Sequence, residues 1–204
     1  MSGSDRSRRL SLLLDGAERI LIVGLFAWLT VRVAASLGET PGNIVFLFSE
    51  GLVTTFVLLR RPTDMISLRP FDWIIGTAGT ALPMLIAPVG GGWIGAVAFC
   101  LLGLAISVGA KLSLRRSFGV VAANRGVKSD GLYGAVRHPM YLGYFILNGG
   151  MLVLNPSIWN AVILVVWAGC QLARIAAEER ILVQDEAYRR HTEKVRFRLL
   201  PLVY

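Results

Sequence analysis

The chain has 204 residues, of which 54% are hydrophobic and 17% are charged, and its formal net charge is +8. A soluble domain of this length carries more charge, so the composition excludes an ordinary soluble protein and favours several membrane spans. Nucleic-acid binding is not indicated, because the basic residues lie in the connections between apolar runs and not along one helix face or in a basic tail.

Six apolar runs follow one another along the chain and predict an all-α integral membrane protein with about six transmembrane helices. The runs cover residues 17–37, 44–59, 71–89, 93–112, 141–154 and 158–176. The first four are close to the ~20 residues that a helix needs to cross the hydrocarbon core, and the last two are shorter or more polar. Residues 1–15 are polar and basic, and no convincing cleavage site closes the apolar run that follows them, so we expect an uncleaved first helix.

The last two runs are separated only by Asn155-Pro156-Ser157. Proline cannot continue a helix, whereas asparagine and serine cap one. The pair is therefore predicted to form a helical hairpin. The charged residues after it, 178–188, keep apolar residues on one face, so this C-terminal segment is expected to be helical, with the last apolar helix running out of the bilayer into it.

The positions of the basic residues predict the orientation in the membrane. If all six runs cross, 20 of the 21 Lys and Arg residues fall on one side, and only Arg32 lies toward the other. The intervening turns at 38–43, 90–92 and 155–157 contain no Lys or Arg. Because basic residues accumulate in cytoplasmic connections, both termini and the polar segments are expected to be cytoplasmic.

Some polar or small residues inside the runs have structural interpretations. Arg32 and Glu50 are costly in lipid and could form an ion pair, or they could lie at a substrate entrance. Gly76, Gly79, Ala81 and Gly103 have the spacing of helix-packing positions. The two cysteines, Cys100 and Cys170, are interpreted as small hydrophobic residues of helices and imply no disulfide or zinc site.

Two polar clusters flank the predicted hairpin, residues 125–141 before it and 174–179 after it. A hairpin returns the chain to the side that it left, so both clusters can meet over one cytoplasmic pocket. Taken alone, each has an ordinary structural explanation. His138 and Pro139 could simply cap and start a helix, and Arg174 and Glu178 could form a surface pair four residues apart.

The sequence contains no pattern typical of a metal centre. Its two histidines, His138 and His191, are far apart, and no carboxylate cluster accompanies them. A glycine-rich phosphate loop is also missing from the sequence, and no Ser-His-Asp arrangement can be argued. We therefore expect no metal.

Short motifs of the C-terminal half occur in an order and spacing that resemble the isoprenylcysteine carboxyl methyltransferase family, within a wider group that includes phospholipid N-methyltransferases. The resemblance covers about the last 90 residues, whereas the first hundred match only as hydrophobic spans. The most specific part is the Arg-His-Pro-x-Tyr box together with a downstream Glu-Glu pair. The matching residues are Ser117-Phe118, Val120-Val121, Gly131-x-Tyr133, Arg137-His138-Pro139-Met140-Tyr141-x-Gly143, Asn155-Pro156, Arg174-x-x-x-Glu178-Glu179 and Glu186-Ala-Tyr188.

The resemblance implies S-adenosylmethionine as the methyl donor, bound at the cytoplasmic side by residues that match the family's cofactor contacts. It implies two parts, the N-terminal transmembrane helices at 1–112 and a cofactor-binding region with hairpin and cytoplasmic tail at 113–204. Arg174 matches the arginine that handles the substrate carboxylate, as a catalytic and substrate-binding residue. The matching cofactor residues are Arg125, Gly126, Val127, Lys128, Tyr133, His138, Pro139, Met140, Tyr141 and Glu178.

The sequence departs from the family at Ala122 or Ala123, where some members have a glutamine, in its tail at 195–201, and in the shorter loop before Gly131. These differences concern the substrate more than the cofactor. The expected reaction is carboxyl O-methylation of an isoprenylcysteine-like or other lipophilic acid that enters from the bilayer. A carboxylate is ionised at pH 7 and needs no general base, and an arginine can orient it bidentately. The alternatives are N-methylation of an amine lipid head group and a non-catalytic membrane scaffold.

Overall fold

The computed structural model describes residues 3–36, 38, 44–59, 66–87, 89–114, 121–124 and 127–200. Most of these residues are helical, and the only β-type pairing among them is an isolated antiparallel bridge between Ile66 and Ala123. The predicted all-α class is therefore confirmed for the part of the chain that is described. The α-helices are α1 (Gly3–Ser36), α2 (Ile44–Leu59), α3 (Pro70–Ala81), α4 (Ala96–Leu114), α5 (Pro139–Leu154), α6 (Ile158–Leu182) and α7 (Glu186–Lys194), and the 3-10 turns are η2 (Leu82–Leu85) and η4 (Gly131–Gly134).

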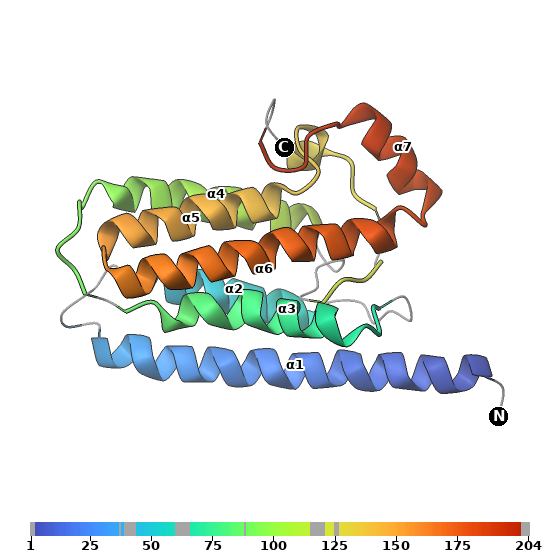
Figure 1. The fold of residues 1–204 in the computed structure, drawn as a ribbon, viewed down its shortest axis with the longest axis horizontal. Helices are drawn as coiled ribbons and strands as arrows, with labels where there is room; N and C mark the ends of the chain where they lie inside the picture. The colour runs from blue at the N-terminus through green and yellow to red at the C-terminus, as the bar shows by residue number, and fades with distance from the viewer. Residues whose placement is uncertain are drawn as a thin grey trace.

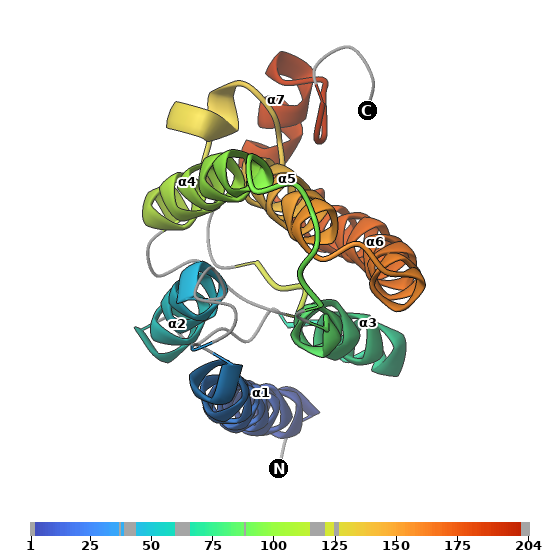
Figure 2. The same cartoon turned by 90° about the vertical axis from the view of Figure 1, so that its left-hand side faces the viewer.

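The first six α-helices run along the long dimension of the molecule (Figure 1). Seen nearly end-on, α4, α5 and α6 lie side by side, α2 and α3 lie beneath them, and α1 covers the far side (Figure 2). The short helices α7 and η4 lie above the bundle near the end where α5 begins and α6 ends (Figure 1). The motif-bearing segments before α5 and after α6 are thus brought to the same end.

Two of the described helices, α4 and α6, are long and apolar enough to cross a membrane, and α5 and residues 47–59 are apolar but shorter. Large aliphatic side chains are exposed on the outer faces of several helices, among them Ile20, Val31, Leu101 and Val165. Such surfaces are typical of helices that face lipid.

The third predicted run, 71–89, does not form one helix, so that prediction is wrong in extent. The α-helix ends at Ala81 and continues only as the 3-10 turn η2, with Pro83 in its first turn. Proline has no backbone N–H and cannot donate to the carbonyl four residues earlier, which here belongs to Gly79. The Gly79 oxygen accepts hydrogen bonds from α6 instead, from Trp167 Nε1 at 3.0 Å and Gln171 Nε2 at 3.2 Å.

The helix starts at the last two runs were predicted correctly. His138 is the N-cap of α5 with Pro139 in its first turn, and the Ser157 side chain caps α6 by accepting from Asn160 N at 3.1 Å. Helix α6 extends to Leu182, beyond the apolar run, so it carries Glu178 and Glu179. A short break then precedes α7, whose N-cap Asp185 accepts from Ala187 N.

Glycines allow α4 and α5 to pack backbone against backbone. A Cβ on Gly143 would lie 2.6 Å from Ser107 N, and a Cβ on Gly103 would lie 2.4 Å from Leu147 N. Neither position leaves room for a side chain, which confirms the helix-packing role predicted for Gly103. The suggested pair of Arg32 and Glu50 is not tested, because the Glu50 side chain lies outside the described residues; the Arg32 guanidinium lies over the Trp28 ring.

Candidate active site

The start of α5 is held in place by the C-terminal tail. Arg137 N donates to Phe197 O at 2.9 Å, and His138 N donates to Arg198 O at 2.8 Å. The tail therefore runs alongside the residues that begin α5. Leu199, one residue further, is buried in the same hydrophobic cluster as Tyr141.

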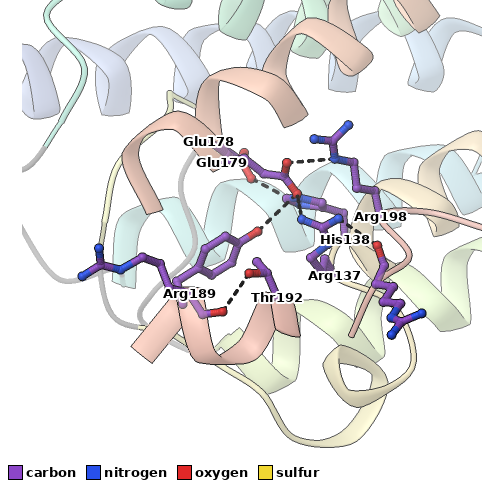
Figure 3. A network of polar contacts seen from close by, with 9 residues as sticks. Arg137, His138, Glu178, Glu179, Arg189, Thr192 and Arg198 are labelled. Carbon is purple, nitrogen blue, oxygen red and sulfur yellow. Dashed lines mark hydrogen bonds and ion pairs between the residues drawn. The ribbon is translucent and has the colours of Figure 1, made fainter. Parts of the chain in front are cut away.

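Glu179 is the centre of a polar network at this end of the bundle. Its Oε1 accepts from Arg137 Nη1 at 2.8 Å and lies 3.3 Å from His138 Nε2, and its Oε2 accepts from Arg198 Nε at 2.8 Å. The Tyr188 hydroxyl of α7 donates to Oε1 at 3.4 Å. Figure 3 shows Arg137, His138 and Arg198 converging on the Glu179 carboxylate. One buried carboxylate thereby joins four separate segments of the chain.

Glu178, the preceding residue, contacts the other side of the His138 ring. The Tyr141 hydroxyl donates to Glu178 Oε1, and Glu178 Oε2 lies 3.9 Å from His138 Nδ1. The His138 and Tyr141 rings meet edge to face, with centroids 5.8 Å apart. The two neighbouring glutamates therefore fix the first turn of α5 relative to the end of α6.

Arg174 lies one helical turn before Glu178 and is 5% exposed, so it is not a residue of a surface pair. Its guanidinium carbon is 5.4 Å from the centroid of the Tyr141 ring, and its Nη1 donates to Gln171 Oε1 at 2.9 Å. Tyr141 thus lies between Arg174 and Glu178, with its ring toward one and its hydroxyl toward the other.

The position of Arg174 depends on α3, almost a hundred residues earlier in the chain. Gln171, which accepts from Arg174, itself donates to the Gly79 carbonyl left open by Pro83. A Cβ on Gly79 would lie 3.0 Å from Arg174 Cδ, so a larger residue there would displace the arginine. The end of α3 therefore both makes room for Arg174 and orients it.

The predicted cofactor residues divide into those that the structure brings together and those that it does not. Tyr133, on η4, is buried in the same cluster as Met140 and Tyr141. Burial, and then the charge of Glu178, raise the pKa of the Tyr133 phenol well above its usual value. Val127 and Lys128 lie in the segment ahead of η4, and among the described residues no hydrogen bond or ion pair joins them to the other predicted cofactor residues. Arg125 and Gly126 lie outside the described residues.

Several residues of this site were not predicted from the sequence. Glu179 was noted only as part of a motif, and no local pattern distinguishes Arg198. A polar Gln171 inside an apolar run was the one available signal. The partners of Arg198 lie in distant segments, which single-sequence patterns do not reveal.

The arrangement offers an anion-binding guanidinium in an enclosed place beside aromatic rings and a carboxylate. Aromatic faces suit a sulfonium cation, and a carboxylate suits hydroxyl or amino donors, so these side chains fit S-adenosylmethionine. The described residues contain no group of three or more His, Cys, Asp or Glu side chains that could hold a metal ion.

Comparison with known proteins identifies the segment that carries this site. The model of the isoprenylcysteine carboxyl methyltransferase family matches residues 96–184, which run from the first residue of α4 to just past the end of α6. No curated protein matches the chain. The matched segment contains the Arg-His-Pro box, Arg174 and both glutamates. This part of the chain therefore matches the isoprenylcysteine carboxyl methyltransferase family, and the match supports a membrane methyltransferase.

Proposed function

We propose that the protein transfers the methyl group of S-adenosylmethionine to the carboxylate of a lipophilic acid, an isoprenylcysteine-like acid or a relative of it, at the cytoplasmic face of a membrane. The observation that carries the proposal is the buried guanidinium of Arg174, oriented by Gln171 and placed next to Tyr141. A carboxylate is the natural partner of a guanidinium whose surroundings exclude water.

The proposed cofactor site lies around the first turn of α5. His138, Pro139, Met140 and Tyr141 of this turn, with Tyr133 and Glu178, would enclose the cofactor, and the preceding stretch 125–128 would cover it. The bound cofactor supplies an electrophilic methyl group on a positively charged sulfur. Glu178, whose carboxylate is oriented by the hydrogen bond from the Tyr141 hydroxyl, would accept hydrogen bonds from the cofactor's amino or ribose hydroxyl groups.

Arg174 would hold the acceptor carboxylate in line with the methyl group. Displacement at a sulfonium by an anion neutralises charge, so excluding water from the reacting atoms accelerates it, and positioning supplies much of the remaining rate. No residue needs to remove a proton from a carboxylic acid that is already ionised at pH 7. Arg174 favours an acid over an amine as the acceptor, because a guanidinium has only donors, which pair with the two oxygens of a carboxylate and offer an amine no acceptor.

The membrane arrangement is part of the same proposal. Six crossings, with α5 and α6 as a hairpin, would put both termini and the site on the cytoplasmic side, as the distribution of Lys and Arg indicates. An acceptor with an apolar tail could then enter from the bilayer while the cofactor enters from water.

Titration of the purified full-length chain with S-adenosylhomocysteine tests the cofactor part of the proposal. We expect one site per chain in the wild type. Arg174→Met should retain this binding and lose methyl transfer, and Arg189→Met, an exposed arginine of α7, should retain both. Transfer that rises steeply with pH would indicate an amine acceptor, and a folded protein that binds no S-adenosylhomocysteine would refute the proposal.

A further inference from the structure

The buried segment 121–124 directly precedes the stretch 125–128 that would cover the cofactor. Val121 and Ala122 are 3% and 5% exposed, so their backbone polar groups need partners inside the protein. Ala122 O accepts a hydrogen bond from Ser67 N at 2.9 Å. The segment is therefore anchored by a part of the chain that lies before the family match begins.

The N–H group of Val121 has its acceptor on α1, the first helix. Val121 N donates to Glu18 Oε1 at 3.2 Å, across 103 positions of the chain. Glu18 is 1% exposed, and Ile22, one turn further along α1, packs in the hydrophobic cluster that contains Tyr141. The face of α1 that carries Glu18 is therefore turned toward the candidate site.

The charge of Glu18 has a role beyond this hydrogen bond, because a neutral acceptor satisfies a backbone N–H equally well. Burying a carboxylate is costly unless opposite charge offsets it. Glu18 interacts electrostatically with Arg174, as Glu178 does. Helix α1 thus supplies one of two carboxylates that act on the arginine proposed to hold the acceptor.

These two carboxylates weaken the attraction of Arg174 for a third. An incoming acid is repelled by Glu18 and Glu178 and shares the guanidinium with them. During methyl transfer the acceptor's carboxylate loses its negative charge, so a strong pair with Arg174 would stabilise the ground state more than the transition state. A nearby carboxylate that keeps this pair weak therefore favours the reaction.

We infer that Glu18 is a positioning residue of the reaction, which anchors the segment leading into the cofactor stretch and limits how tightly Arg174 holds the acid. This inference rests on the proposed function. It extends the site to α1, which lies outside the segment that matches the family. A merely structural glutamate differs in one respect, because its replacement would weaken the binding of the acid and not strengthen it.

Glu18→Gln tests the charge, and Glu18→Leu tests the anchor. Calorimetry on the full-length protein measures the dissociation constant of S-adenosylhomocysteine and then, at saturation, that of N-acetyl-S-farnesylcysteine. Glutamine keeps an oxygen for Val121 N, so Glu18→Gln should leave S-adenosylhomocysteine binding unchanged and bind the acid about tenfold more tightly. Its KM for the acid and its kcat should both fall. Glu18→Leu removes the acceptor of Val121 N and should also weaken S-adenosylhomocysteine binding about fivefold.

Asp15→Asn is the matched control, because Asp15 is a second buried carboxylate of α1 and pairs with Arg19 at 3.2 Å. It should change neither dissociation constant. Acid binding that is unchanged or weaker in Glu18→Gln overturns the inference, and so does S-adenosylhomocysteine binding in Glu18→Leu that equals the wild type.

A second comparison covers the case in which Glu18→Gln alone does not fold. The double variant Glu18→Gln/Arg174→Met, which removes both charges together, is compared with Arg174→Met. Their affinities for the acid should be equal, and tighter binding by the double variant overturns the inference, because the effect would then not act through Arg174. A wild type that binds no S-adenosylhomocysteine or no acid would show that the proposed function itself has failed.

Discussion

Replacing Glu179 by glutamine tests whether the network in Figure 3 holds the site together. The change keeps the shape of the side chain but removes its charge and one acceptor oxygen. The new amide group would point N–H donors at Arg137 or Arg198, which are themselves donors. The substitution therefore leaves buried donors without acceptors.

The expected size of the effect follows from the exposure of the partners. The bond from Arg137, whose side chain is 15% exposed, is charge-assisted and worth about 1.5–3 kcal/mol. The bond from Arg198, whose side chain is 38% exposed, is screened by solvent and contributes less than about 1 kcal/mol. We expect the free energy of unfolding to fall by about 2–3 kcal/mol. Loss of the contact with His138, about 1 kcal/mol, should also weaken S-adenosylhomocysteine binding about fivefold.

Denaturant unfolding in detergent and calorimetric titration of S-adenosylhomocysteine measure the two effects. Glu186→Gln is the matched control, because Glu186 pairs with Arg190 at 3.0 Å on the exposed face of α7 and should change stability by less than about 0.5 kcal/mol. The reasoning is refuted if Glu179→Gln is no more harmful than Glu186→Gln in both measurements.

Three other substitutions probe separate links in the structure. Gly143→Ala should separate α4 from α5 and lower the unfolding midpoint by several degrees, whereas Gly149→Ala, with open space around it, should not; equal midpoints would contradict the packing. Gln171→Leu should release Arg174 and raise the acceptor KM severalfold with unchanged S-adenosylhomocysteine affinity, and an unchanged KM would show that the contact is dispensable. The pKa of His191 is lowered from 6.5, first by burial and then by nearby cations. Below about pH 6.5 the unfolded chain therefore binds a proton that the folded chain does not, so the free energy of unfolding decreases as the pH is lowered. His191→Gln should lose stability less steeply between pH 7.5 and 5.5, and parallel curves would contradict this.

The helical class and the start of α5 could be predicted because their causes are local. An apolar run of sufficient length favours a helix, and His138 followed by Pro139 marks a helix start wherever it occurs. The turn between α5 and α6 could also be predicted from local sequence, since a proline and a capping serine lie within three residues.

The break after α3 could also have been predicted, because Pro83 is visible in the run 71–89. The prediction weighed the length and hydropathy of the run and gave too little weight to the backbone donor that proline lacks. The consequence, an open carbonyl at Gly79 that receives Gln171, depends on which helix packs beside α3. Nothing in the local sequence specifies that neighbour.

The candidate site was predicted as two clusters that meet, and the structure brings their main members together around Tyr141. What could not be predicted are the contacts that orient them. The contact between Glu179 and Arg198 arises from the tertiary fold alone. The same is true of the dependence of Arg174 on Gly79. Lys111 sits at the end of an apolar run, where a lysine ordinarily extends toward water, and only the close packing of α4 on α5 buries it.

The most direct test of the central claim is transfer of an isotopically labelled methyl group. The full-length protein in detergent or lipid is incubated with labelled S-adenosylmethionine and N-acetyl-S-farnesylcysteine, and the extracted product is treated with mild alkali. A methyl ester releases labelled methanol under these conditions, and an N-methyl group does not. We predict an apolar product whose label is released by alkali and which is not formed by Arg174→Met. Label that resists alkali, or equal product from Arg174→Met, would contradict the assignment of a carboxyl methyltransferase that uses Arg174.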